Sequence, residues 1–536
     1  MQAPETQTRE RVGSGTEAHA PAPQYSRYHI DTRPAPPVAR HPHRFTVEVS
    51  RVGLAKLIVT ELWHYRAHPE VVFSRPCVYG VFSGPVGGFA PRDRLCVGCL
   101  RCTTQYPEMV RILPNPDRLT LGDAYFRPEI VDTLVYEAET GQVPVKGAGY
   151  RGRFGGEGWD GMWTDMSEIV RPTRDGIHGR EFISTQVDLG ERPAFLVFDD
   201  AGRPVGVVPR VVTLPLPLVF DVPPAAAGGR RVLETTARAA AALDTLAVVP
   251  VASLVGDVPA ASALAGGHIV PLVRPAEVGL LAGLAFTPRL VEIDGTAPGG
   301  PLGGSTDASG TLRDGTDPDG TDPDSTPPDS PPPTGGADVD ALVAAVDAAR
   351  RLAPDAVVGL RLAFGPSLAG DLVRLVGRGV RAFHLVADLH GRATDGDFVL
   401  ESIRRAHTGL VAAGRRDEVT LIGSGGMIAA EHVPKAILCG LDAVALDTPV
   451  LVALQATFEG ECRDRAASRF TLPEADEAWG AQRLMNLAAS WRDQLLEILG
   501  AMGMREVRRL RGEMGRAMFQ RDLEREAFEG IEGYDA

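Results

Sequence analysis

The chain has 536 residues, of which 23% are charged and 44% are hydrophobic, and its formal net charge is −14 at pH 7. This length favours an enzyme with one large domain and smaller flanking pieces. The acidic balance argues against nucleic acid as a general partner. No stretch of the sequence approaches the roughly 18 apolar residues that cross a bilayer, so we expect no membrane span.

The cysteines are unevenly spread along the chain. Cys77, Cys96, Cys99 and Cys102 stand together, whereas Cys439 and Cys462 are far away. Such clustering is typical of a cofactor site and not of a secreted disulfide framework. We therefore expect a protein of the reducing cytoplasm.

Composition divides the chain into four parts. Residues 1–42 are rich in Pro, Ala and charges and are expected to form a flexible tail, and residues 43–160 form a Cys-rich region. Residues 161–460 hold the main domain, and residues 461–536 are expected to be a helical cap. Within the main domain, residues 299–336 are an Asp, Pro and Gly-rich insertion that we expect to be disordered.

The main domain alternates apolar runs with segments of helical period, which is typical of βα units and a parallel sheet. The expected strands cover residues 216–221, 245–251, 268–273, 289–294, 356–363, 382–388, 419–426 and 443–448. Eight parallel strands close into a (β/α)8 TIM barrel, an α/β fold. The insertion then leaves the carboxyl end of the fourth strand, on the rim where catalytic loops lie.

The strongest local motif is CVGCLRC, residues 96–102, whose closely spaced thiolates suit an iron-sulfur cluster. The fourth cysteine of ferredoxin-type runs is replaced by Tyr106, so Cys77 is the expected fourth ligand beside Cys96, Cys99 and Cys102. The sequence therefore predicts a 4Fe-4S cluster. A 3Fe-4S centre on three cysteines and a tetrahedral zinc site are the alternatives.

A second motif, LIGSGGM, ends a buried strand in glycines before a helix. Backbone amides at such a turn bind phosphate, and the loop after the next strand supplies a second wall, as in barrels that bind phosphate after strands seven and eight. We expect the cofactor to be held by Gly423, Ser424, Gly425, Gly426, Asp447 and Thr448. The alternative is a tight turn without a ligand.

Three further residues are candidates for catalysis. Arg361 stands near the carboxyl end of the fifth strand, where a cation could stabilise a reduced flavin, or could pair with a carboxylate inside the barrel. Asp388 and His390 follow the sixth strand and offer acid-base groups at the rim. A structural role for His390 is the alternative.

Several segments resemble the FMN-binding glutamate synthase family in the same order. They include VEIDGTAPGGPLGG, GLRLAF, ADLHGRATDG, IGSGGMIAAEHVPKAILCGLDAVALDTPVLVAL and LLEILGAMGMREVRRLRGEMGR. The cysteine segment is similar to the ferredoxin-like piece of archaeal-type members. The resemblance implies a TIM barrel that holds FMN, with Gly425, Gly426, Asp447 and Thr448 around its phosphate and Arg361 at its ring.

The resemblance also implies an oxidoreductase acting on CH-NH2 donors, which reduces 2-iminoglutarate to glutamate. Its substrates would be 2-oxoglutarate and ammonia, and its electrons would come from a ferredoxin or a reductase subunit. The sequence departs from the family at two lysines, because Arg361 and Asp294 stand in the corresponding segments. A flavin-binding or scaffold subunit, and an FMN oxidoreductase of another amino or hydroxy acid, therefore stay open.

Overall fold

The structure is a computed structural model of the whole chain. It describes residues 28–66, 68, 77–144, 158–164, 183–191, 197–205, 210–224, 227, 229–255, 266–296 and 339–531. Residues 146–152, with the sequence KGAGYRG, and the polar residues 166–182 lie outside the described part of the chain.

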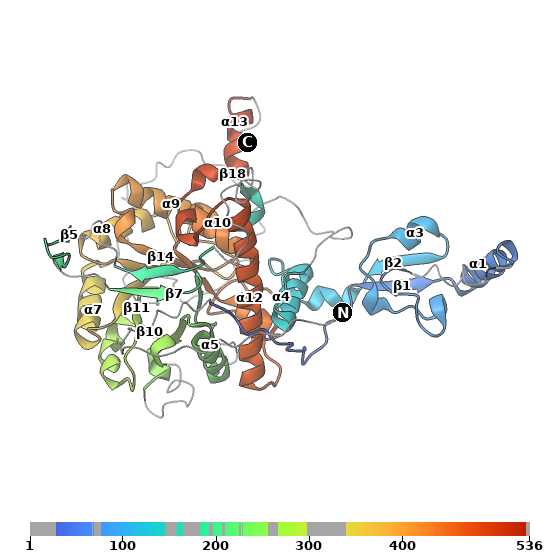
Figure 1. Cartoon of the computed structure of the whole chain (residues 1–536), viewed down its shortest axis with the longest axis horizontal. Helices are drawn as coiled ribbons and strands as arrows, with labels where there is room; N and C mark the ends of the chain where they lie inside the picture. The colour runs from blue at the N-terminus through green and yellow to red at the C-terminus, as the bar shows by residue number, and fades with distance from the viewer. Residues whose placement is uncertain are drawn as a thin grey trace, which may run out of the picture.

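Eight parallel strands form a closed barrel, which confirms the predicted (β/α)8 fold (Figure 1). In chain order they are β8 (Leu218–Phe220), β9 (Ala247–Pro250), β10 (Ile269–Val273), β11 (Leu290–Asp294), β12 (Val357–Ala363), β13 (Ala382–Val386), β14 (Thr420–Ser424) and β15 (Ala443–Leu446). Each pairs with the next, and β15 pairs with β8 to close the ring. All eight predicted runs contain a strand of this barrel.

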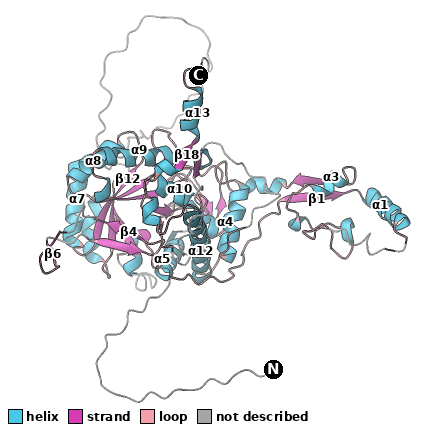
Figure 2. Cartoon of the chain, turned by 45° about the horizontal axis from the view of Figure 1, so that its top comes forward, coloured by secondary structure: helices cyan, strands magenta, loops and turns pink. Residues whose placement is uncertain are grey.

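Helices on the outside of the barrel cover the strands (Figure 2). They are α5 (Gly229–Leu243), α7 (Val339–Leu352), α8 (Leu368–Gly377), α9 (Val399–Ala412), α10 (His432–Cys439) and α11 (Thr448–Ala453). Residues of β13 and β15 are buried throughout, because one face of each strand lies inside the ring and the other lies under the helices. This explains why the strands read as continuous apolar runs.

The acidic insertion follows the fourth barrel strand, as expected. β11 ends at Asp294 and α7 begins at Val339, so the connection leaves the carboxyl end of that strand. Residues 297–338 lie outside the described part of the chain, so the predicted disorder of the insertion stays a prediction.

The predicted C-terminal helix is interrupted. α12 (Glu477–Ala501) packs against α5 and against α4 (Pro128–Thr140), and α13 (Gln520–Phe528) follows after a break. The break contains 3-10 turns and β18 (Ala517–Phe519), which pairs with β3 (Met162–Thr164) from before the barrel. The helical cap expected over residues 461–536 therefore contains two separate α-helices.

The expected tail is shorter than the composition indicated. Ile30 and Ala35 are buried, and the backbone around Arg33 exchanges hydrogen bonds with the Asn486 side chain of α12. The Val38 amide donates to Gln455 at the end of α11. Residues 28–42 are thus held by side chains distant in sequence, and the prediction of a flexible tail was wrong for them.

The cysteines lie in a small module beside the barrel (Figure 1). It contains β1 (Phe45–Val49) paired with β2 (Val110–Pro114), together with α1 (Arg51–His64) and α3 (Arg101–Gln105). Its own core is built on Val47, Val81, Cys96 and Val110. Folding of this module and placement of its thiols therefore depend on the same few residues.

Shorter elements complete the fold. The remaining strands are β4 (Val187–Gly190) paired with β7 (Val211–Leu214), β5 (Val197–Phe198) with β6 (Pro204–Val205), and β16 (Thr457–Phe458) with β17 (Phe470–Thr471). The 3-10 helices are η1 (Gly87–Phe89), η2 (Asp93–Leu95), η3 (Pro116–Thr120), η4 (Gly158–Gly161), η6 (Val251–Ser253), η7 (Gly266–His268), η8 (Pro275–Gly283), η9 (Arg416–Glu418), η10 (Val507–Leu510) and η11 (Met514–Arg516). Among the described residues, no helix is both long enough and apolar enough to cross a bilayer.

His407 of α9 makes the stability of the barrel depend on pH. Burial, together with the neighbouring guanidiniums of Arg416 and Arg511, lowers the pKa of His407 from 6.5 to about 4. Because the folded protein then binds fewer protons than the unfolded chain, stability is full above pH 6.5 and falls between 6.5 and 4. After allowance for solvent screening we expect a loss of about 1 kcal/mol.

The measurement is the free energy of unfolding in urea from pH 7.5 to 4.5 for the wild type and His407→Gln. The glutamine side chain can accept the hydrogen bond that Arg416 donates to His407, but it does not titrate. We expect the two pH profiles to converge as the pH falls. Parallel profiles would contradict the assignment.

Candidate functional site: the mouth of the barrel

A buried ion pair lies at the carboxyl ends of the barrel strands. Arg361 of β12 donates to both carboxylate oxygens of Asp221, which follows β8, at 2.7 and 2.8 Å. The Arg361 and Asp221 residues are only 3% and 2% exposed. This bidentate pair is the carboxylate alternative that the sequence left open for Arg361, and a contact of Arg361 with a flavin stays a prediction.

Two more polar side chains join the pair from inside the barrel. His384 of β13 places Nδ1 3.0 Å from Glu292 Oε1 of β11, and its Nε2 lies 3.1 Å from Ser424 Oγ of β14. The Glu292 carboxylate also lies 3.5 Å from the Arg361 guanidinium. All of these side chains are buried, so each depends on the others for its hydrogen bonds.

Arg465 closes the mouth from outside the barrel. Its segment lies between β16 and β17, and its guanidinium donates to Asp447 Oδ2 at 2.5 Å and to the Ala387 carbonyl at 2.9 Å. It also lies 3.5 Å from Asp221. A single side chain from the segment after the barrel thus bridges the ends of β8, β13 and β15.

The surroundings of Asp221 and Asp447 shift their pKa values in opposite directions. Burial alone would raise the pKa of Asp221, but Arg361, His384 and Arg465 hold that pKa below its usual value. Burial raises the pKa of Asp447, and the single cation Arg465 offsets this only in part. Asp221 is therefore the fixed anion of the mouth, and Asp447 is the carboxyl whose charge is less strongly held.

The glycine turn after β14 is packed against the loop after β13. Gly425 and Gly426 have φ values of 96° and 72°, a region that favours glycine. A Cβ on Gly425 would lie 2.5 Å from the Asp388 carbonyl oxygen, and one on Gly426 would lie 2.5 Å from Gly391 Cα. Both glycines are therefore required by the contact between the two loops, whether or not a ligand is bound there.

Two aromatic residues from before the barrel fix the same turn. The Tyr125 hydroxyl and the Trp159 indole both donate to the Gly426 carbonyl, at 2.7 and 2.9 Å. Trp159 also stacks on His432 at the start of α10, with ring centroids 5.1 Å apart. The turn is thus held in place by side chains from before the barrel.

The Thr448 hydroxyl gives the clearest indication of where a ligand could bind. Its residue is fully buried at the start of α11, and its Oγ1 has no hydrogen-bond partner among the described residues. A buried hydroxyl without a partner costs about 1 to 3 kcal/mol, and at this position a ligand oxygen could supply the missing partner. Asp447 precedes it and accepts from the Thr448 amide.

Gly423 has a different role in packing, because a Cβ there would lie 2.4 Å from Leu441.

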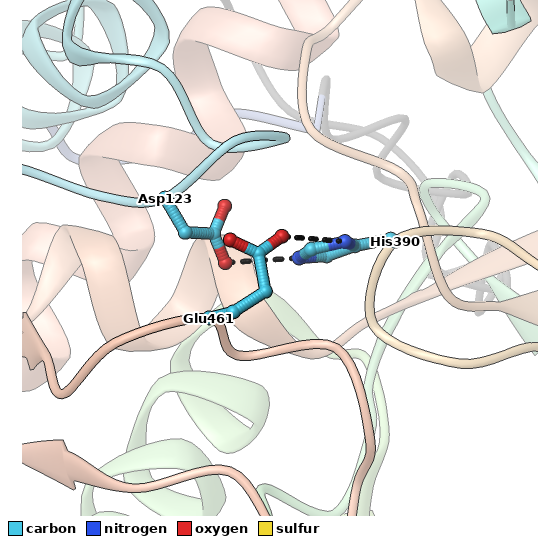
Figure 3. Close-up of side chains that lie close together, drawn as sticks. All are labelled: Asp123, His390 and Glu461. Carbon is cyan, nitrogen blue, oxygen red and sulfur yellow. Dashed lines mark hydrogen bonds and ion pairs between the residues drawn. The ribbon is translucent and has the colours of Figure 1, made fainter. Parts of the chain in front are cut away.

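His390 connects three separate segments (Figure 3). Its Nε2 lies 2.9 Å from Asp123 Oδ2, and its Nδ1 lies 3.5 Å from Glu461 Oε1. Asp123 also accepts from the Phe126 and Cys462 amides. Both ring nitrogens of His390 therefore contact protein carboxylates, an arrangement that fits the structural alternative, and a catalytic role stays a prediction.

Asp388 organises its own loop. Its Oδ1 accepts from the amides of His390 and Arg392, and its Oδ2 accepts from Arg463 at 2.6 Å. These three bonds occupy both oxygens of the carboxylate. A catalytic role of Asp388 stays a prediction, and its described contacts are those of a loop anchor.

The four clustered cysteines lie near one another in the small module. Cys96 is buried, Cys77 and Cys102 are half-buried, and Cys99 is exposed. Burial raises the pKa of the Cys96 thiol, the Gly98 amide lowers it, and the nearby Cys102, Cys77 and Cys99 raise it further. The chain turns through left-handed conformations at Gly98 and Leu100, with φ of 70° and 57°, to place the cysteines of this loop.

The spacing of these thiols bears on which cofactor fits. Among the described residues, ligand atoms of three His, Cys, Asp or Glu side chains come within 4.8 Å of one another only at Asp123, His390 and Glu461. Tetrahedral zinc with bonds of about 2.3 Å would hold its sulfurs about 3.8 Å apart. An iron-sulfur cluster needs wider spacing, because its iron atoms lie between the ligands.

Sequence reasoning missed Asp221, Glu292, His384 and Arg465 as members of the site. A signal was present for the first three, because each is a polar residue within or directly after an apolar barrel strand. No such signal marked Arg465, which lies in an irregular segment. The two cysteines outside the cluster, Cys439 and Cys462, are both buried free thiols.

The fold and its charged mouth define an α/β-barrel protein with a glycine turn and a buried threonine after strands seven and eight. Residues 389–505 match the family described as a conserved region in glutamate synthase. This segment is thus similar to a conserved region of glutamate synthase, in agreement with the resemblance seen in the sequence.

Relatives extend this likeness over most of the chain. An archaeal-type glutamate synthase [NADPH] of Dehalococcoides mccartyi is 26% identical over 78% of this chain and 86% of its own length. An archaeal glutamate synthase [NADPH] of Archaeoglobus fulgidus is 26% identical over 82% of this chain and 89% of its own. Among solved structures, a mandelate oxidase mutant with an FMN adduct covers 61% of this chain and 87% of its own, with 17% identity and a TM-score of 0.35.

Breaking the buried pair should destabilise the fold. Asp221→Asn leaves Arg361 charged with a neutral partner, and removal of one partner of a buried pair costs about 3 to 5 kcal/mol. We expect a loss near the lower end, because Glu292 and Arg361 lie 3.5 Å apart.

The measurement is urea unfolding, with Asp294→Asn at the half-buried end of β11 as the matched control. We expect the control to lose much less stability than Asp221→Asn. An equal loss in the two variants would show that the barrel does not depend on this pair.

Proposed function

We propose that the chain is an oxidoreductase of the glutamate synthase type, which binds FMN at the mouth of the barrel. It would reduce an imino acid, 2-iminoglutarate, to glutamate, and so act on the CH-NH2 class of substrate. The buried hydroxyl of Thr448 is the single observation that most supports this proposal, because it lacks a partner beside a rigid glycine turn. Relatives named glutamate synthase support the choice of reaction.

The residues at the mouth fit the phosphate end of FMN. Thr448 Oγ1 can donate to a phosphate oxygen, and the turn at Gly425 and Gly426 brings backbone close to the same place. Arg465, now paired with Asp447, supplies a cation that can share its charge with the phosphate. When bound, FMN supplies the hydride chemistry that the side chains of this chain lack.

The substrate would meet the fixed charges of the same mouth. Arg361 and Arg465 both lie near Asp221, so the mouth holds two cations around one strongly ionised carboxylate. Arg465 is the more exposed of the two cations and could share its charge with a carboxylate of the imino acid. The buried position of Arg361 favours an electrostatic role over direct contact.

The cysteine module would carry electrons through a 4Fe-4S cluster bound by Cys77, Cys96, Cys99 and Cys102. The Gly98 and Thr103 amides lie where they lower the thiol pKa values, and they would stabilise the thiolate ligands of a cluster. Cys99 is exposed, so this side of the module is open to a donor such as a ferredoxin or a reductase. A 3Fe-4S centre is the remaining iron alternative.

Thr448→Val tests the FMN site. Valine has nearly the shape of threonine and removes only the hydroxyl, so the protein without flavin should keep its stability or gain a little. FMN should bind about tenfold more weakly, the equivalent of one hydrogen bond to a charged group. Isothermal titration with FMN and thermal unfolding without it are the two measurements.

Thr408→Val is the matched control, because Thr408 is exposed on α9 and its hydroxyl bonds only within that helix. Flavin affinity should be unchanged in the control. Equal FMN affinity in Thr448→Val and the wild type would place the phosphate elsewhere.

Cys99→Ser tests the cluster. The exposed thiol can be replaced with little effect on the core of the module, and loss of one ligand should lower iron content and the broad visible absorbance. Iron and zinc analysis with an electron paramagnetic resonance spectrum of the reduced protein are the measurements. Cys462→Ser is the control, since this buried thiol is separate from the cluster. Stoichiometric zinc without iron in the wild type would refute the cluster.

A further inference from the structure

We propose that Glu292, His384 and Ser424 form a proton relay inside the barrel that ends at its mouth. The Ser424 hydroxyl would be the group that gives the proton to the bound substrate. This inference rests on the proposed function and assigns roles within it to three side chains that the sequence did not single out together.

The positions of the three residues along their strands place the last of them at the mouth. Glu292 lies two residues before the carboxyl end of β11, and His384 lies two residues before the carboxyl end of β13. Ser424 is the last residue of β14. The chain of contacts therefore runs across the barrel at one depth from Glu292 to His384 and ends at the mouth with Ser424.

The hydrogen bonds of His384 fix which groups its ring faces. Nδ1 lies 3.0 Å from Glu292 Oε1 and 3.0 Å from an Arg361 nitrogen, and the guanidinium can only donate. That nitrogen carries two hydrogens and donates one of them to Asp221 at 2.7 Å. A carboxylate would be repelled by a lone pair on Nδ1, so we place a hydrogen on Nδ1 and direct it to Glu292.

The charges around the ring favour a second proton. Arg465 is paired with Asp447, and the Arg361 guanidinium faces two buried carboxylates, those of Asp221 and Glu292. One further positive charge balances the group, and the imidazole is the one that contacts both a carboxylate and a hydroxyl. A hydrogen on Nε2 then points to Ser424 Oγ at 3.1 Å.

Ser424 is left with one hydrogen to donate. Its oxygen accepts from His384 Nε2, and an Arg465 nitrogen lies 3.4 Å away on another side. A hydroxyl has two lone pairs and one hydrogen, so both contacts can be accepted while the hydrogen stays available. Ser424 directly precedes the glycine turn proposed for the phosphate, and His384 connects it to Arg361, the residue expected at the flavin ring.

The relay supplies the proton that the proposed reduction requires. Conversion of a C=N bond to an amine adds a hydride to carbon and a proton to nitrogen, and the two electrons come with the hydride that the flavin supplies. Ser424 Oγ gives its hydrogen to the imine nitrogen and takes the hydrogen from His384 Nε2. The imidazole is left neutral, with Nδ1 still donating to Glu292, and a proton from water restores it after the product leaves.

The first test compares Ser424→Ala with Ser402→Ala, a matched control in α9 whose buried hydroxyl has no partner in the described structure. Dithionite-reduced protein is given 2-oxoglutarate and ammonia, and glutamate is measured. At saturating FMN we expect kcat of Ser424→Ala to fall about 100-fold, the usual contribution of a positioned proton donor, with KM for 2-oxoglutarate little changed. Turnover equal to that of the control would overturn the proposal.

The second test does not depend on turnover. Nuclear magnetic resonance of protein with 15N-labelled histidine shows which ring nitrogens carry hydrogen, and the His384 signal is identified by its loss in His384→Gln. We expect hydrogen on both nitrogens in the wild type, and loss of one in Glu292→Gln. An unprotonated Nδ1 in the wild type would overturn the relay. A wild type that makes no glutamate contradicts the proposed function instead, and the relay is then judged by this spectrum.

Discussion

The barrel depends on how it accommodates a charged guanidinium in its interior. Arg361 is buried within a parallel strand, so the strand can exist only if carboxylates meet that charge. Asp221 meets it from the first strand and Glu292 from the fourth, and these contacts fix the first, fourth and fifth strands relative to one another. His384, Ser424 and Arg465 then have defined places around the pair, so the chemistry of the mouth follows from one interaction.

Segments outside the barrel are built into the same site. Asp123 and Tyr125 follow the cysteine module, and they contact His390 on one rim loop and the Gly426 carbonyl on another. Arg465 arrives from the opposite direction, after the last barrel strand. The module and the segment after the barrel therefore both hold the rim, which gives a physical reason for a cysteine module and a barrel to share one chain.

The sequence was a good guide to the barrel and a poor one to its interior. Eight apolar runs of strand length predicted eight strands, because parallel strands that are buried on both faces are apolar along almost their whole length. Glu292 and His384 stood within those runs, but the pattern cannot say which polar side chains will meet across the ring. Residues 28–42 were misjudged for a related reason, since their order depends on Asn486 and Gln455, more than 400 residues away. Thr448 was chosen for its place after the eighth strand, and the structure adds that its hydroxyl lacks a partner.

The central claim is that this charged mouth holds the phosphate end of FMN. A crystal structure of the full chain with FMN tests it most directly. The account predicts a phosphate oxygen within hydrogen-bonding distance of Thr448 Oγ1, beside the turn at Gly425 and Gly426, with Arg361 still paired to Asp221. A flavin bound elsewhere, with the Thr448 hydroxyl still enclosed and without a partner, would contradict it.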